Sequence, residues 1–214
     1  MNYEVISTGS NGNCTVLEDV IAIDMGISFK ALKPYLKGLK LVCLTHIHSD
    51  HFNAKTIKKL ASERPTLRFA CGEHLNEELK ALGIKNIDVL KIGKKYDYGT
   101  FKLSPVKLYH DVTNIGWRFY IGTERAIYCT DTKTLDGISA KDYDLYLIEA
   151  NYCDEELRKR ISEKESKGEF VYEYSVPDRH LSKQQADNFI CENIGKNGVY
   201  VYMHQHRERG SGDA

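Results

Sequence analysis

Residues 45–51 read Thr45-His46-Ile47-His48-Ser49-Asp50-His51 and directly follow the apolar run 39–44. We expect that run to be a buried strand, because a short apolar segment bounded by polar residues is typical of one. Where the strand ends and a loop turns over the sheet edge, His46 and His48 can project to one side. Asp50 and His51 then curl back from the start of the next element. Imidazole and carboxylate ligands suit Zn²⁺, Mn²⁺ or Fe²⁺, so the stretch predicts a metal site at a sheet edge.

Three further candidate ligands follow predicted strands in the same way. His110 follows the run 101–108, Asp131 follows a run that ends at residue 130, and His204 follows the run 199–203. Sheet proteins concentrate functional side chains in the loops at strand ends. Each of these residues alone is also well explained as an ordinary loop residue. Beside the 45–51 cluster, we interpret all three as additional metal ligands.

The rest of the chain alternates short runs rich in Val, Ile and Tyr with turns and helical patterns. The first half predicts a meander of antiparallel strands and then β-α-β alternation, and the second half repeats this layout. We expect one domain over residues 1–206 and a flexible polar tail over residues 207–214. Strands are predicted at 3–6, 14–17, 20–23, 39–44, 67–70, 87–90, 101–108, 117–121, 125–129, 145–148 and 199–203. Helices are predicted at 29–36, 53–60, 73–82, 154–165 and 183–194.

Composition limits the classes of partner. Among the 214 residues, 30 Lys and Arg balance 30 Asp and Glu, so no global positive charge indicates a nucleic acid or a membrane. No apolar run approaches the ~20 residues that span a bilayer, and the N-terminus lacks the pattern of a signal peptide. The six cysteines form no C-x-x-C pair, which favours reduced core thiols. We therefore expect a cytoplasmic protein that does not bind membranes.

The ordered set His46-x-His48-x-Asp50-His51, His110, Asp131 and His204 resembles the ligand set of the metallo-β-lactamase fold superfamily. Asp24 matches an aspartate that such proteins keep on an early strand near the metals. The resemblance implies an α/β fold, a four-layer αββα sandwich of two mixed sheets flanked by helices. Residues 8–14, 130–132, 148–151 and 180–182 are similar to the bacterial YycJ (WalJ) branch, DNA exonucleases related to ribonuclease Z-like phosphodiesterases.

This resemblance also implies roles for individual residues. Two divalent ions, Zn²⁺ or Mn²⁺, would be held by His46, His48 and His110 and by Asp50, His51 and His204, with Asp131 bridging. A hydroxide between the two ions would be the nucleophile. Beside the ligands, Asp24, Asp50 and His180 are the catalytic candidates, and Glu149, Asn151, Ser182 and His206 are the candidate substrate contacts. His180 is equally consistent with a neighbour of a helix cap, and His206 competes with His204 as the last ligand.

The function predicted from these residues is hydrolysis of phosphodiesters by a dinuclear metal site, with the hydroxide as nucleophile. A nuclease resembling a DNA exonuclease is the leading hypothesis, with DNA favoured over RNA as partner. A small-molecule hydrolase acting on a cyclic nucleotide, thioester or lactone is the alternative. Tyr172 and Tyr174 could stack on bases, but we expect them on one face of a hairpin. The sequence does not predict the oligomeric state.

Overall fold

The computed structural model of the chain describes residues 1–205. The predictions for His206 and for a tail over residues 207–214 lie outside this part. Among residues 1–205, no helix combines the length and the apolar character needed to cross a membrane.

The N-terminal sheet has six strands in sequential order, which run from the meander into the β-α-β stretch. The first three strands pair antiparallel, and from the third onward the pairs are parallel, so both predicted patterns are confirmed. The strands are β1 (Tyr3–Ser7), β2 (Cys14–Leu17), β3 (Ile21–Ile23), β4 (Leu41–Cys43), β5 (Arg68–Cys71) and β6 (Ile87–Val89).

The C-terminal sheet also has six strands, in the order β12-β11-β10-β9-β8-β7. The neighbouring strands from β7 through β10 pair antiparallel, whereas β10, β11 and β12 pair parallel. The strands are β7 (Tyr96–Asp97), β8 (Lys102–Tyr109), β9 (Thr113–Ile121), β10 (Glu124–Cys129), β11 (Leu145–Glu149) and β12 (Val199–Met203).

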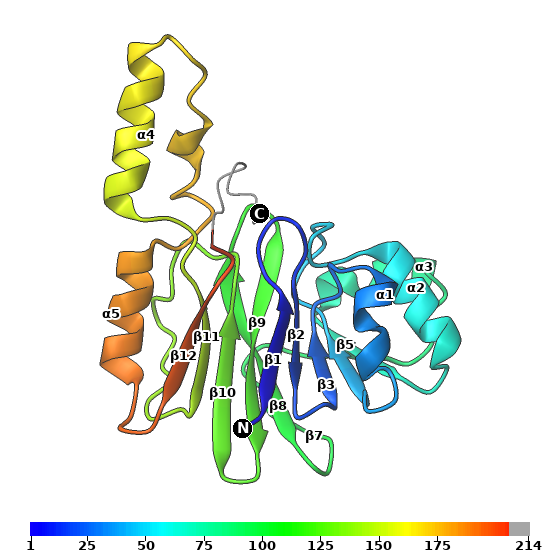
Figure 1. The fold of residues 1–214 in the computed structure, drawn as a ribbon. Coiled ribbons are helices and arrows are strands. Elements are labelled where there is room, and N and C mark those ends of the chain that lie inside the picture. The colour runs from blue at the N-terminus through cyan, green and yellow to red at the C-terminus, as the bar shows by residue number, and fades with distance from the viewer. Residues whose placement is uncertain (206–214) are drawn as a thin grey trace.

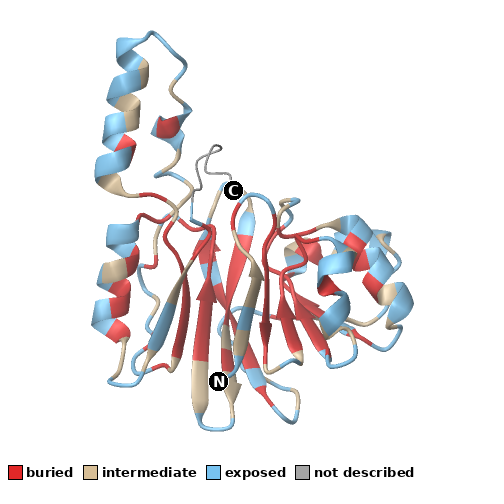
Figure 2. Cartoon of the chain, viewed as in Figure 1, coloured by how far each residue is buried: buried red, intermediate tan, exposed pale blue. Residues whose placement is uncertain are grey.

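Helices cover the outer face of each sheet, so the four-layer αββα sandwich of two mixed sheets is confirmed (Figure 1). The helices α1 (Phe29–Leu32), α2 (Ala54–Glu63) and α3 (Asn76–Ala81) pack on the N-terminal sheet, and α5 (Lys183–Asn193) packs on the C-terminal sheet. A third apolar cluster, with Trp117 at its centre, fills the space between the sheets. Most of the strand residues in both sheets are accordingly buried (Figure 2).

One helix does not follow this layering. The helix α4 (Asp154–Ser166) projects beyond the strand ends of the C-terminal sheet (Figure 1). The chain returns beside it through a short 3-10 helix, η3 (Tyr172–Ser175). The prediction of a hairpin here is wrong, because Glu173 turns inward and pairs with Lys164 of α4 at 2.6 Å.

Three smaller predictions are corrected. The helix expected at 29–36 changes after Leu32 into a 3-10 helix, Lys33–Tyr35, where Pro34 cannot donate a helical hydrogen bond. Strand β9 begins at Thr113 rather than at 117, because Thr113 still pairs with Tyr109. All six cysteines are free, but Cys191 is exposed and Cys153 half-buried, so only four of them are core thiols.

Candidate metal centre

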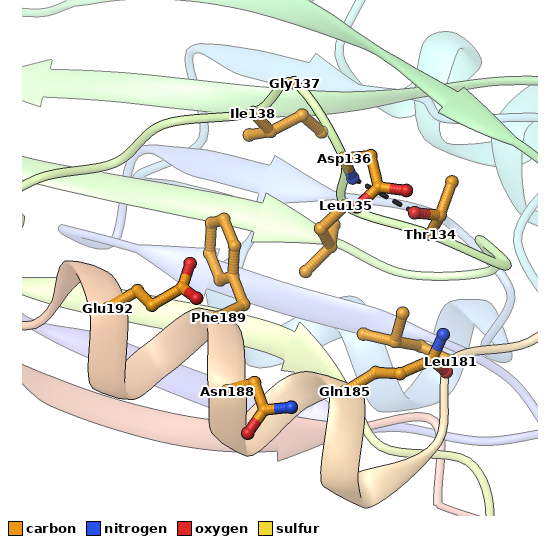
Figure 3. A pocket seen from close by; sticks show the side chains of 10 residues that line it. All are labelled: Thr134, Leu135, Asp136, Gly137, Ile138, Leu181, Gln185, Asn188, Phe189 and Glu192. Atoms are coloured by element: carbon orange, nitrogen blue, oxygen red, sulfur yellow. Dashed lines mark hydrogen bonds between the residues drawn. The ribbon is translucent and has the colours of Figure 1, made fainter.

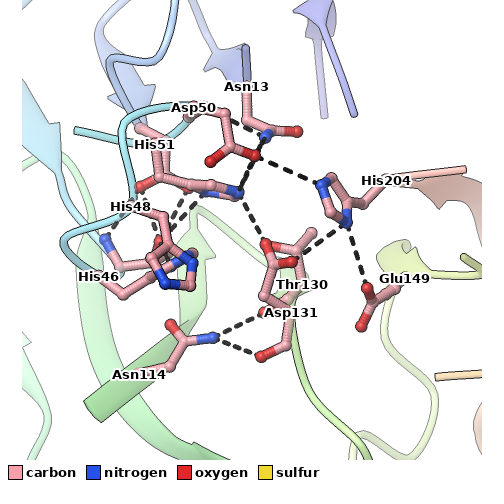
Figure 4. Close-up of polar contacts among 12 residues, drawn as sticks. Asn13, His46, His48, Asp50, His51, Asn114, Thr130, Asp131, Glu149 and His204 are labelled. Carbon is pink, nitrogen blue, oxygen red and sulfur yellow. Dashed lines mark hydrogen bonds and ion pairs between the residues drawn. The ribbon is translucent and has the colours of Figure 1, made fainter. Parts of the chain in front are cut away.

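Five strand ends deliver side chains to one place between the two sheets (Figure 4). The loop after β4 carries His46, His48, Asp50 and His51. Asp24 follows β3 in the same sheet. From the other sheet, His110, Asp131 and His204 follow β8, β10 and β12. The structure therefore brings together all seven residues that the sequence predicts as ligands.

The first group of potential ligands contains only imidazoles. Ligand atoms of His46, His48 and His110 all lie within 4.8 Å of one another. His48 Nδ1 is 3.2 Å from His46 Nε2 and 3.3 Å from His110 Nε2. Three nitrogens that converge in this way match the number of protein ligands in a typical open zinc site.

The second group adds a carboxylate, and Asp131 lies between the groups. Asp50 Oδ2 is 3.6 Å from His51 Nε2 and 3.5 Å from His204 Nε2. Asp131 Oδ2 lies 2.7 Å from His51 Nε2, whereas Asp131 Oδ1 lies 3.1 Å from His204 Nδ1 and 4.0 Å from His110 Nε2. One carboxylate thus reaches residues of both groups.

The donor set fits divalent cations. Asp131 Oδ2 and His204 Nε2 are buried and, despite their short contacts with neighbouring charges, have no hydrogen-bond partner of acceptable geometry among residues 1–205. Leaving such atoms unsatisfied costs free energy, unless an ion takes the place of the missing partner. Imidazole nitrogens with carboxylate oxygens are the ligands that Zn²⁺ and Mn²⁺ accept.

Charges within the cluster shift several pKa values. Burial lowers the pKa of His46, and neighbouring His51 adds to this effect. Burial also acts to lower the pKa of His51, but the carboxylates of Asp131 and Asp24 outweigh it and hold that pKa well above its usual value. For His204, burial again acts to lower the pKa, but nearby carboxylates, Asp131 above all, outweigh it and raise that pKa to about 10. In the protein alone, these two imidazoliums therefore balance the central carboxylates.

Asp24 lies beneath the cluster rather than in it. Its side chain is fully buried, accepts from Thr45 N at 2.9 Å and lies 2.7 Å from His51 Nδ1. A carboxylate on the far nitrogen of a ligand histidine fixes the orientation and tautomer of the ring. In this structure Asp24 is therefore placed to position His51, and its catalytic role stays a prediction.

Glu149 also has a buried position. Its Oε2 accepts from the backbone N–H groups of Thr132 and Leu181, at 2.8 and 3.2 Å. Its Oε1 lies 2.7 Å from His180 Nδ1 and 3.3 Å from His204 Nδ1. Because the side chain is fully buried, Glu149 holds two histidines and is not placed to contact a substrate.

The other predicted substrate contacts occupy different positions. Ser182 is buried and caps α5 in a capping box with Gln185, so it too lies beneath the site. Asn151 is half-buried and donates to the carbonyl of His204 at 2.9 Å. His180 borders the cluster, with its side chain 16% exposed and its Nδ1 3.4 Å from Asp131 Oδ1.

Sequence reasoning missed three polar residues of the cluster. Asn13 Nδ2 lies 2.8 Å from His51 Nε2, and Asn114 donates to the carbonyl of Asp131 at 2.7 Å. Asp111 Oδ1 is 3.2 Å from His110 Nε2 and 3.4 Å from His48 Nε2. Asp111 follows His110 directly and Asn13 lies in the stretch 8–14 that supports the family resemblance, so both had an available signal, whereas Asn114 had none.

The cluster opens toward solvent on one side. The side chains of His48 and Asp111 are 36% and 37% exposed, and that of Asp50 is 22% exposed, whereas those of His51 and Asp24 are fully buried. Arg179 stands at this rim, with its guanidinium 3.6 Å from Asp111 and its carbonyl 2.9 Å from His110 Nδ1. A ligand therefore approaches from the side of His48, Asp50 and Asp111.

A separate cavity of about 340 Å³ lies between the loop 134–138 and α5 (Figure 3). Leu135, Ile138 and Phe189 give it an apolar wall, and no histidine or cysteine lines it. It therefore lacks the ligands that define the metal cluster.

Comparisons with known proteins bear on the family and the fold. The model of the beta-lactamase superfamily domain matches residues 21–187. The fold is shared with the metallo-beta-lactamase fold protein YhfI from Bacillus subtilis, at 18% identity and a TM-score of 0.72 over 95% of this chain and 85% of that one. It is shared with the short form of human tRNase Z, at 14% identity and a TM-score of 0.70 over 97% and 93%. A diphosphatase from the PhnP family gives 14% identity and a TM-score of 0.65 over 95% and 86%. No curated protein matches the chain.

Proposed function

The chain belongs to the beta-lactamase superfamily, and on that premise we propose that it is a dinuclear metal-dependent hydrolase that cleaves phosphodiester bonds as a nuclease. The position of Asp131 carries the proposal. Its two carboxylate oxygens lie against His51 and His204 and face His110, so a single side chain joins the two ligand groups. A shared carboxylate is the usual device for holding two metal ions close together.

In this proposal, His46, His48 and His110 hold one ion, and Asp50, His51 and His204 hold the other. Bound divalent ions would lower the pKa of an attacking water and neutralise charge on phosphoryl oxygens. Asp50 is the ligand with the largest exposed fraction in its group, so its carboxylate is placed to orient a water at the mouth of the site.

His180 is the proposed proton donor to the leaving oxygen. Glu149 Oε1 holds its Nδ1 at 2.7 Å, which leaves the Nε2 nitrogen free to give up a proton. A carboxylate on Nδ1 fixes the tautomer and stabilises the imidazolium between proton transfers. The partial exposure of the ring is what contact with a substrate requires.

The absence of a thiolate among the ligands supports phosphate chemistry. None of the potential ligand groups formed within residues 1–205 contains a cysteine. β-Lactam-cleaving members of the superfamily are expected to use a thiolate in the second site, where this chain offers Asp131 and Asp50. Two proteins that share the fold are named as a tRNase and a diphosphatase, and both names denote cleavage at phosphate.

The test combines metal analysis with a substrate screen in Zn²⁺ and Mn²⁺. We expect about two ions per chain, and hydrolysis of labelled DNA in preference to RNA, cyclic nucleotides and thioesters. Asp50→Asn should abolish hydrolysis, whereas the control Asp136→Asn, at an exposed carboxylate outside the cluster, should not. Metal-loaded protein that cleaves only a cyclic nucleotide, thioester or lactone would replace the nuclease by the small-molecule hydrolase.

A further inference from the structure

A second cavity adjoins the metal centre at the base of the projecting helix. It has a volume of about 470 Å³ and lies where the segment after β11, the start of α5 and the end of β12 meet. Its polar lining includes Asn151, Cys153, Glu156, Arg160, Lys183 and Gln205. A volume of this size is typical of ligand pockets.

One side chain, that of Asn151, links the cavity to the candidate ligands. Asn151 lines it and also donates to the carbonyl of His204, with Asn151 Nδ2 3.4 Å from His204 Nδ1. Gln205, which also lines the cavity, directly follows His204 in the chain. A substrate bound at the metal centre therefore has this cavity as its neighbour.

Cations dominate the lining. Lys183 and Arg160 face a single lining carboxylate, that of Glu156. Lys183 is partly neutralised, because its Nζ lies 3.1 Å from Asp187. Arg160 forms no ion pair with the described residues, and its Nε is buried without a hydrogen-bond partner there.

The buried Nε–H of Arg160 calls for an acceptor. Arg160 also lines a smaller cavity together with Glu173, but that carboxylate already pairs with Lys164 at 2.6 Å. Leaving a buried N–H group without a partner is unfavourable, and a planar guanidinium matches a phosphate with two parallel hydrogen bonds.

We propose that this cavity is a subsite for the phosphate next to the scissile one in a polynucleotide, with Arg160 as its anion-binding residue. The inference rests on the proposed function and narrows it. A substrate with one phosphate gains nothing from the cavity, whereas a chain of nucleotides places its next phosphate there. Arg160 therefore determines preference for a polynucleotide over a simple ester.

The test compares two arginines of the same helix. Arg160→Gln removes the proposed contact, and Arg158→Gln removes the same charge from an exposed position outside the cavity. With oligothymidylate, Arg160→Gln should lower kcat/KM about tenfold and reduce the salt dependence of binding by about one phosphate contact. With bis(p-nitrophenyl) phosphate both variants should match the wild type. Arg160→Lys, which keeps the charge without the two-pronged geometry, should fall in between.

Equilibrium binding separates this inference from the proposed activity. Fluorescence anisotropy of labelled oligothymidylate with the metal-free protein at low salt should show weaker binding by Arg160→Gln than by Arg158→Gln. If the wild type cleaves neither substrate, the proposed function fails, but the binding difference still supports the subsite. Equal binding by the two variants, or an equal loss on the small ester, overturns the subsite.

Discussion

Replacement of Glu149 by glutamine tests how the buried carboxylate organises the site. A glutamine side chain has one accepting oxygen and one donating NH₂ group, whereas both carboxylate oxygens of Glu149 accept. Glutamine therefore cannot replace both sets of contacts that Glu149 makes. The amide must either oppose the N–H groups of Thr132 and Leu181 or turn toward the Nδ1 atoms of His180 and His204. A hydrogen bond to a charged group contributes about 1.5–3 kcal/mol, so we expect a stability loss of about that size.

The functional effect should be larger than the loss of stability explains. A side chain that orients a metal ligand through its second nitrogen typically changes affinity or activity about 10- to 100-fold. We therefore expect Glu149→Gln to weaken Zn²⁺ binding, measured by chelator competition, and to lower kcat by a similar factor. The assays are run well below the Tm of the variant, with the exposed Glu169→Gln as control. If Glu149→Gln is less stable but equals the control in metal affinity and kcat, the carboxylate only caps backbone groups and our reasoning is refuted.

Two further predictions concern the metals and the loop that carries them. The raised pKa values of His51 and His204 keep both rings protonated near pH 7, so Zn²⁺ loading should release about two protons. Calorimetry in buffers of different ionisation enthalpy measures this release. A release near zero would contradict these pKa shifts. A Cβ at Gly26 would lie 1.7 Å from the carbonyl oxygen of Asp50, so Gly26→Ala should displace that loop, cost about 1–3 kcal/mol and lower metal affinity. Gly83→Ala, where a Cβ meets open space at a positive φ, should lower the Tm but leave metal affinity unchanged.

Periodicity and residue type predicted most of the fold. The apolar runs around β4, β10 and β11 lie between two layers, so their sequences are nearly continuous in hydrophobic residues and easy to identify. Strand β7 was missed, because a two-residue strand at a sheet edge leaves no pattern. The hairpin expected around Tyr172 failed for a related reason, since local propensity does not reveal the ion pair between Glu173 and half-buried Lys164 of α4 that holds this segment.

The candidate ligands were predictable because their chemistry is rare and their positions follow strands. The backbone conformation at these positions was not predictable. Asp24, Asp131 and His204 all have positive φ, at 58°, 55° and 49°, a conformation that costs a residue with a side chain about 1–2 kcal/mol. Each is the point where a strand turns into the site.

Small polar side chains offset that cost. Thr45 Oγ1 donates to the carboxylate of Asp24, Asn114 Nδ2 donates to the carbonyl of Asp131, and Thr8 Oγ1 accepts from the backbone N–H of His204 at 2.7 Å. Thr8 and Thr45 lie in stretches that support the family resemblance, but threonine and asparagine occur at many turns, so residue type alone does not reveal the role of these three. Their role follows only from the contact with a residue of positive φ. The contact of Thr8 also links the two sheets, because Thr8 follows β1 of the first sheet and restrains His204, which follows β12 of the second. The geometry of the metal centre is thus set by side chains that are neither apolar enough to form a pattern nor reactive enough to form a motif.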